Sequence, residues 1–264
     1  MKCDFCNKDY TKNIYSLGKY DEHFICEECY IKLNNKVNRY NYKPNFDFKG
    51  SKDRKKHLHI GVELELQASD NWNFCLFLKQ FRKNKNIYMK RDGSLNNWGI
   101  EFVSMPMTYY YLNHNSFKKL FESLNKYQFN NINHCGLHFH IDRQYLDTAD
   151  TAKIDYIVNN WTNILSEIGG REFNRYCITI YKHQDEYGKP INFNRYLACN
   201  LLNADTIELR FCASTYDYNT FIKRITLIFS IVDISKQYTF KQLMETNNYE
   251  EIINEHMRKY LKSF

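Results

Sequence analysis

The chain has 264 residues, of which 43% are hydrophobic and 17% aromatic, enough for one sizeable domain with its own core and a small additional module. Its formal charge of +7, from 37 basic and 30 acidic side chains, favours anionic ligands but is too small to indicate a general nucleic-acid binder. No run of residues is as long and apolar as a membrane span, and the first residues lack a secretory signal, so we expect a cytoplasmic protein without membrane contact.

Four cysteines lie near the start of the chain as two C-x2-C pairs with nineteen residues between them: Cys3, Cys6, Cys26 and Cys29. This spacing predicts a zinc site, because two short knuckles can bring four thiolates to one tetrahedral ion. We expect residues 1–40 to form a small zinc-ribbon-like module whose folding depends on a structural Zn²⁺. The alternative is four unrelated buried thiols.

Residues 41–56 are polar and contain a basic cluster, Lys49, Lys52, Arg54, Lys55 and Lys56. We interpret this segment as a solvated linker. The alternative is that its basic side chains add phosphate contacts to a zinc module that binds nucleic acid or protein.

From His57 onward, short segments with period-two alternation are separated by longer helical ones, which predicts a mixed α+β domain over 57–264. The predicted strands are 57–67, 100–104, 136–142 and 206–212. The predicted helices are 72–83, 108–127, 150–168 and 217–236. We expect these helices to cover one face of a sheet.

Each predicted strand places apolar side chains on one face and charged or imidazole side chains on the other. In 57–67, for example, Val62 and Leu64 oppose Glu63 and Glu65. The side chains expected on the polar face are Glu63, Glu65, Glu101, His138, His140, Asp142, Glu208 and Arg210. If the strands form one antiparallel sheet, the apolar face packs on helices and the polar face gathers these groups in a pocket.

The composition of this face indicates metal and phosphate chemistry. Glu63 and Glu65 are two residues apart on one strand, roughly 7 Å from each other, so their carboxylates repel unless cations lie between them. That spacing suits more than one metal ion. Glutamate, histidine and arginine together suit Mg²⁺ or Mn²⁺ and phosphate oxygens. The alternative is an ordinary solvated sheet face, which favours threonine, lysine and glutamine instead.

Six segments resemble, in order, the amidoligase family of the glutamine synthetase and glutamate–cysteine ligase superfamily: GVELEL, DGSL, GIEFVSMP, GLHFHI, FNRYLACN and TIELRF. The resemblance spans about 57–216 and leaves the cysteine module outside. It implies a curved antiparallel sheet with helices on one face, like the catalytic domain of glutamine synthetase. It also implies an ATP-dependent carboxylate–amine ligase that forms an amide or isopeptide bond through an acyl phosphate, with ATP and divalent ions on the concave face.

The resemblance also implies roles for individual residues. Glu63, Glu65, His138 and Glu208 correspond to metal ligands, and His138 and His140 lie in the motif that contacts metal or phosphate. Arg210 resembles the arginine that stabilises the transferred phosphoryl group. Glu101 resembles a further acidic metal or substrate ligand, and Asp92 a residue that orients the amine or a water. Arg175 and Arg195 resemble phosphate or substrate-carboxylate clamps.

Two other classes of function stay open. A metal-dependent phosphoesterase or nuclease would use the same acidic and imidazole groups to activate water. A zinc-containing binding protein would keep the ligase-like domain as an inactive scaffold. No glycine-rich P-loop is present, so an ATP site here is of another kind. The abundance of Asn, Lys, Ile and Tyr fits an AT-rich genome, such as that of a low-GC bacterium or its phage.

Overall fold

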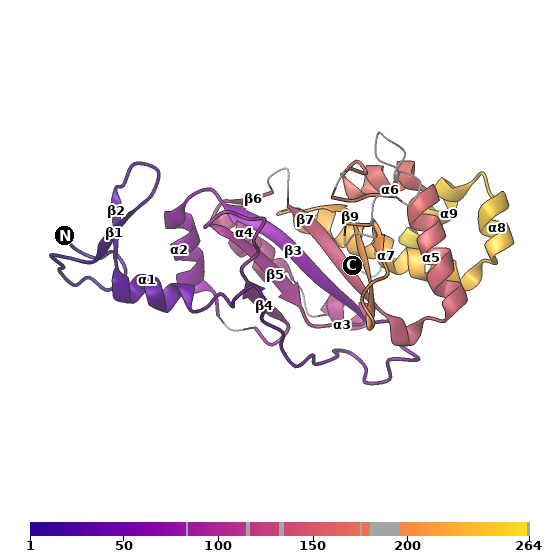
Figure 1. Cartoon of the computed structure of the whole chain (residues 1–264), viewed down its shortest axis with the longest axis horizontal. Coiled ribbons are helices and arrows are strands. Elements are labelled where there is room, and N and C mark those ends of the chain that lie inside the picture. Colours follow the sequence, from indigo (N-terminus) through magenta and orange to yellow (C-terminus); the bar gives the residue numbers. More distant parts are fainter. Residues whose placement is uncertain (83, 115–116, 132–134, 175, 180–195, 263–264) are drawn as a thin grey trace.

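The computed structural model describes residues 1–82, 84–114, 117–131, 135–174, 176–179 and 196–262. The molecule is elongated, with the cysteine module at one end, a sheet in the middle and a group of helices at the other end (Figure 1). The cysteine module and the main domain each combine helices with antiparallel strands, so the predicted α+β class is confirmed.

The main sheet is antiparallel throughout, with strand order β4-β5-β3-β7-β9-β8 and with β6 also paired to β3. Its strands are β3 (Ile60–Ala68), β4 (Ile87–Lys90), β5 (Gly99–Ser104), β6 (Phe129–Asn130), β7 (Gly136–Asp142), β8 (Cys199–Asn200) and β9 (Thr206–Ala213). The four predicted strands correspond to β3, β5, β7 and β9. Sequence analysis missed β4, β6 and β8, which are short.

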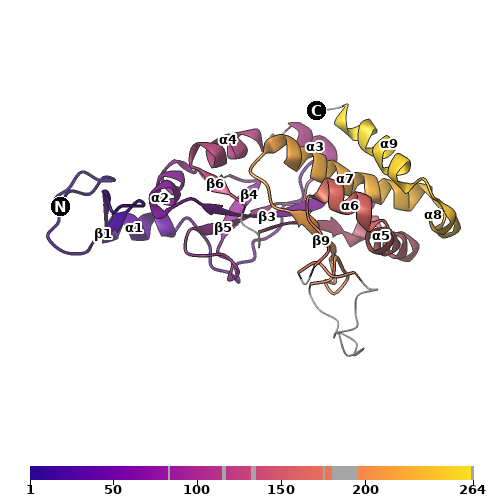
Figure 2. The ribbon, with the colours of Figure 1, turned by 90° about the horizontal axis from the view of Figure 1, so that it is seen from above.

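The apolar face of this sheet packs against helices, as alternation predicts. Leu64 lies opposite both Phe102 and Leu137, and Phe139 lies opposite Leu209. All five side chains are buried. Helices α3, α4 and α7 lie along this side of the sheet, so the other face is left for the charged side chains (Figure 2).

The helices and the short 3₁₀ turn are α2 (Asn71–Gln80), α3 (Tyr109–His114), α4 (Lys118–Lys126), η1 (Arg143–Tyr145), α5 (Thr148–Asn160), α6 (Thr162–Gly169), α7 (Tyr218–Gln237), α8 (Phe240–Glu245) and α9 (Tyr249–Leu261). The helices predicted over 72–83 and 217–236 are confirmed. Those predicted over 108–127 and 150–168 are each two helices. Helix α5 ends at Asn160 because the next residue, Trp161, has a φ of −95° and a ψ of 35°, outside the helical region. Sequence analysis did not predict α8 or α9.

Aspartate and threonine residues fix where several helices begin. Asp70 accepts a hydrogen bond from the backbone N–H of Asn73 at the start of α2, and Asp217 accepts one from Thr220 at the start of α7. Each carboxylate satisfies a donor that has no partner inside the helix. The long helix α7 then runs under the sheet with most of its side chains buried.

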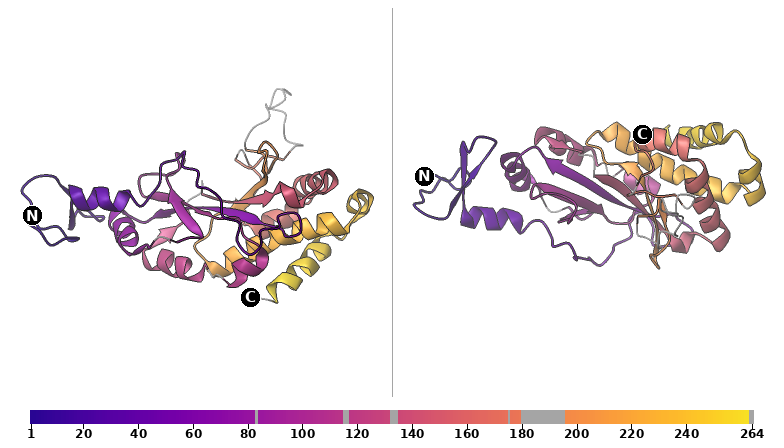
Figure 3. Two further views of the ribbon diagram at one scale, coloured as in Figure 1. Left: turned by 90° about the horizontal axis from the view of Figure 1, so that it is seen from below. Right: turned by 45° about the horizontal axis from the view of Figure 1, so that its top comes forward.

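The cysteine module consists of a hairpin, β1 (Ile14–Leu17) and β2 (His23–Cys26), followed by helix α1 (Glu27–Asn34). The prediction of two knuckles is wrong for the second cysteine pair, because Cys26 ends β2 and Cys29 lies in the first turn of α1. The module packs against α2, where the His23 ring stacks on Trp72 with centroids 3.7 Å apart. Figure 3 shows the module beside α2 in both views.

The segment between the module and the sheet is tied to the main domain. Arg54 donates from Nε and Nη2 to the two carboxylate oxygens of Asp142, each at 2.7 Å, and Asp142 is buried. The guanidinium also lies 4.0 Å from the Phe48 ring centroid. A fully solvated linker is therefore the wrong description of Arg54, although Lys55 and Lys56 are exposed. Both carboxylate oxygens of Asp142, which was expected on the charged face of the sheet, are therefore engaged by Arg54.

Candidate functional site

The strand register brings the predicted polar side chains of β3, β7 and β9 together. Glu63 lies opposite His138, and His140 lies opposite Glu208. His140 Nε2 is 3.4 Å from a Glu63 oxygen, whereas His138 Nδ1 is 3.7 Å from Glu63 and 3.9 Å from Glu208. Glu63, His140 and Glu208 each offer one ligand atom, and these atoms lie within 4.8 Å of one another. Two carboxylates and an imidazole suit a divalent cation such as Mn²⁺ or Mg²⁺.

Electrostatics within this group favour charged carboxylates. Burial disfavours the charged form of Glu63, but His140 and His138 outweigh it and hold the pKa of Glu63 well below its usual range. Burial acts in the same way on Glu208, where His140 and Arg210 keep the pKa low. The two carboxylates in turn raise the pKa of His140 against its own burial. A bound divalent cation would require the neutral imidazole of His140, because metal ligands must be deprotonated.

Lys90 of β4 adds a cation that sequence analysis did not single out. Lys90 lies opposite Glu101 of β5 in the strand register. The Lys90 Nζ is 3.1 Å from a Glu101 oxygen and 3.7 Å from a Glu63 oxygen. Burial and the charge of Glu63 raise the pKa of Glu101 to about 9, although Lys90 opposes this rise. The two acids therefore differ, since Glu63 is ionised at neutral pH and Glu101 is the one that holds a proton.

Glu65 shares the polar face but has partners of its own. Its Oε2 accepts a hydrogen bond of 2.7 Å from the backbone N–H of Gly136, and its carbonyl oxygen accepts one from the Ser214 hydroxyl. Burial raises the pKa of this carboxyl, and Asp92 adds to the rise. Glu65 is not part of the compact group formed by Glu63, His140 and Glu208. Its role as a metal ligand stays a prediction.

Arg210 lies beside Glu208 on β9, and its Nη1 donates to a Glu208 oxygen. Asn200 of β8 donates to the other oxygen at 2.8 Å, so both oxygens of Glu208 are fixed. Among the described residues, the buried Nε of Arg210 has no hydrogen-bond partner. The guanidinium lies 5.8 Å from the Tyr196 ring centroid. Arg210 thus presents an uncommitted donor at the same face as the carboxylates.

The remaining predicted residues lie in a turn beside the sheet or outside the described part of the chain. Asp92 lies in the turn between β4 and β5, where its Oδ1 accepts from the Ser94 N–H at 2.7 Å. That bond stabilises the turn, and the predicted role of Asp92 toward an amine or a water stays a prediction. Arg175 and Arg195 lie outside the described residues.

The four N-terminal cysteines form a second candidate metal centre, since one sulfur atom from each lies within 4.8 Å of the others. The Sγ atoms of Cys6 and Cys26 are 3.8 Å apart, too far for a disulfide. A tetrahedron with Zn–S bonds of about 2.3 Å has edges of about 3.8 Å, so this separation fits zinc. A backbone hydrogen bond from Lys8 helps to lower the pKa of Cys6 to about 7, whereas burial raises the pKa of Cys29. A four-cysteine cluster is therefore confirmed, with the ligand chemistry of a zinc site.

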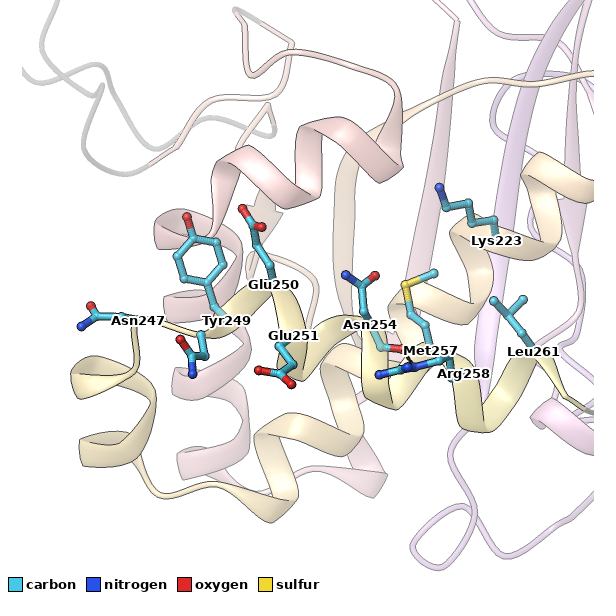
Figure 4. A pocket seen from close by; sticks show the side chains of 10 residues that line it. Lys223, Asn247, Tyr249, Glu250, Glu251, Asn254, Met257, Arg258 and Leu261 are labelled. Carbon is cyan, nitrogen blue, oxygen red and sulfur yellow. Dashed lines mark hydrogen bonds between the residues drawn. The ribbon is translucent and has the colours of Figure 1, made fainter.

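A separate hollow lies elsewhere, between α7 and α9. This open groove has a volume of about 810 Å³ and is lined by polar and charged side chains such as Lys223, Tyr249, Asn254 and Arg258 (Figure 4). None of the charged sheet-face residues named above lines it. Its mixed charges point to no one ligand, so we place the functional site by side-chain chemistry.

Three residues of the site were missed by sequence analysis: Lys90, Asn200 and Gly136. Lys90 lies two residues before Asp92 of the DGSL segment, and Asn200 ends the FNRYLACN segment, so both were within reach of the motifs. Gly136 has a specific steric role, because a Cβ at this position would lie 2.3 Å from His138 Nε2. A glycine two residues before an H-x-H pair, in the pattern G-x-H-x-H, is the signal that identifies it.

Comparison with protein-family models gives no match, and comparison with curated proteins gives none. The class of this protein is therefore described from its fold and its two clusters alone. The chain is a mixed α+β protein with an acidic and imidazole cluster on a sheet face and a four-cysteine cluster at one end. No helix in the described ranges is both long and apolar enough to cross a membrane.

Proposed function

We propose that the chain is an ATP-dependent carboxylate–amine ligase that uses a divalent cation on the charged face of the sheet. The observation that carries the proposal is the convergence of Glu63, His140 and Glu208 within 4.8 Å, with Arg210 beside Glu208. A cation and a guanidinium on one face are the groups that a polyphosphate needs. The ordered resemblance of six segments to the amidoligase family adds to this support.

Under this proposal, Glu63, His140 and Glu208 hold Mg²⁺ or Mn²⁺, and the ion offsets the negative charge of the ATP phosphates when bound. The substrate carboxylate attacks the γ-phosphorus, ADP leaves, and an acyl phosphate forms. The neutral amine then attacks the acyl carbon, phosphate leaves, the nitrogen gives up a proton, and an amide remains. Arg210 Nε, free of partners among the described residues, donates to the transferred phosphoryl oxygens. Asn200 holds Glu208 in place.

The proposal extends to the fold and to the cysteine module. We propose that the sheet is the curved ligase sheet of the glutamine synthetase superfamily. We also propose that the module holds a structural Zn²⁺, in a zinc-ribbon-like variant whose second cysteine pair starts a helix. The convergence of the four sulfur atoms and the 3.8 Å between Cys6 and Cys26 support the metal assignment.

The test is ATP binding by calorimetry with and without Mg²⁺, followed by turnover with mixed acids and amines. We expect magnesium-dependent binding in wild type, and loss of about 3 kcal/mol or more of transition-state stabilisation in Arg210→Ala. Glu63→Gln and Glu208→Gln should lose turnover with an intact fold. The matched control is Glu122→Gln, an exposed acid on α4. Unchanged turnover in all three site variants would contradict the proposal.

The same experiment separates the two alternatives. Magnesium-dependent cleavage of a phosphodiester without ATP favours a phosphoesterase or nuclease. Tight binding of a protein or nucleic acid with no nucleotide binding favours an inactive scaffold.

A further inference from the structure

A single lysine occupies the part of the sheet face where a second metal ion is expected. Lys90 Nζ is 3.1 Å from Glu101 and 3.7 Å from Glu63, and the lysine side chain is only 15% exposed. Mg²⁺ requires carboxylate oxygens at about 2.0 to 2.1 Å, so an ion between these two acids would need the space that the ammonium fills. The two cations would also repel each other in this buried setting.

The structure holds Lys90 in this position from several sides. The backbone on each side of Lys90 is hydrogen-bonded to Asn38. The Asn38 N–H donates to Met89 O at 2.9 Å, and the Arg91 N–H donates to Asn38 O at 2.9 Å. The Tyr40 ring lies over the ammonium with its centroid 6.0 Å away. Lys90 is therefore fixed at both its backbone and its head group.

The neighbouring acid, Glu65, has one of its two carboxylate oxygens engaged. The Oε2 atom of Glu65 is occupied by the Gly136 N–H, so the spacing of Glu63 and Glu65 does not by itself provide two ion positions. Glu63, His140 and Glu208 supply three ligands to one position, on the side of Glu63 away from Lys90 on β4.

We propose that Lys90 replaces the second divalent cation, so that the sheet face binds one metal ion and presents a fixed ammonium beside it. This inference rests on the proposed function and specifies its cation requirement. The ammonium then serves the phosphate oxygens of the nucleotide as a point charge, in the role that a second ion would have. A one-metal site follows, in place of the several ions expected from sequence.

The test counts Mn²⁺ bound per zinc-loaded full-length chain, by calorimetry and by the electron paramagnetic resonance signal of free Mn²⁺. We expect one ion in wild type, one in Lys90→Arg and two in Lys90→Met or Lys90→Gln, which free Glu63 and Glu101. Glu208→Gln should bind none, which places the ion on the sheet face. Lys55→Met, at an exposed lysine, is the matched control and should bind one.

Two ions in wild type would overturn the role of Lys90 while leaving the ligase proposal intact, and this result needs no variant to fold. One ion in both folded neutral variants would also overturn it. No ion in wild type would remove the divalent cation from the proposed function and the inference with it.

Discussion

At the scale of single residues, the position of His138 depends on the absence of a side chain at Gly136. A Cβ there would lie 2.3 Å from His138 Nε2, whereas a Cβ on Gly93 meets nothing within 4 Å. We predict that Gly136→Ala displaces the imidazole and destabilises the fold by about 1–3 kcal/mol, the range for overpacking a core. Chemical denaturation measures the change, with Gly93→Ala as the control. Equal stability of the two variants would contradict the steric role of Gly136.

Alternation in the sequence predicts which face a residue occupies but not its partners. Glu63, His140 and Glu208 were all expected on the polar face, and the register places them there. The sequence pattern does not distinguish His138 from His140, because both have the same parity in one strand. Their difference arises from the shift in β7–β9 pairing between Leu137 and Phe139, which depends on tertiary contacts.

At the scale of elements, helices α5 and α7 are joined by a buried carboxylate. Asp150 caps the start of α5, and Lys236 of α7 donates to it at 2.8 Å. Burial disfavours its charge, but Lys236 and the Asp147 N–H outweigh burial and lower the pKa of Asp150. Because the folded pKa lies below the unfolded value of about 3.9, this stabilisation is present above that value and is lost as pH falls through the folded pKa.

We therefore predict that Asp150→Asn lowers the free energy of unfolding by about 1.5–3 kcal/mol at pH 7, the range for a hydrogen bond to a charged group. As pH falls from 7 through the folded pKa of Asp150, the variant and wild type should converge, since the wild-type carboxylate then also becomes neutral. Urea denaturation across this pH range measures both. Asp53→Asn, in an exposed ion pair, is the control and should change stability by less than about 1 kcal/mol. A gap that persists at low pH would contradict the charge-based account.

Element length decides what the sequence predicts. The long strands β3, β7 and β9 carry several alternations each, and their positions were predicted. Strand β4 has four residues, and its outer edge is completed by Asn38 from a distant segment. That pairing is a tertiary contact, so Lys90 was not expected in the site. The spacing of the second cysteine pair is likewise the same in a knuckle and in the first turn of a helix.

At the scale of the whole molecule, Arg54 holds the segment after the cysteine module against the sheet. Asp142 is 3% exposed, so removing its partner leaves a buried carboxylate without its bidentate donor. We predict that Arg54→Ala destabilises the protein by about 2–3 kcal/mol and that Arg54→Lys recovers only part of this loss. Lys55→Ala is the control. Thermal unfolding measures the relative stabilities of these variants. An Arg54→Ala variant as stable as Lys55→Ala would show that the contact between Arg54 and Asp142 is dispensable.

The cysteine module also reaches the sheet, because the segment after α1 pairs with β4. Arg91 N donates to Asn38 O, and the Arg91 side chain donates to Asn34 of α1 at 2.5 Å. If the module holds the proposed Zn²⁺, the ion would supply much of the folding free energy of so small a module, so chelation should unfold it and release this edge of the sheet. We predict that the Arg91 amide then exchanges its hydrogen roughly tenfold faster or more, as for a local loss of about 1.4 kcal/mol. The Arg210 amide, bonded to Ala198 O on the far side, should keep its rate. In Cys3→Ser the Arg91 amide should already be fast and insensitive to chelator. Unchanged exchange at Arg91 after zinc removal would mean that β4, and Lys90 with it, is held by the sheet alone.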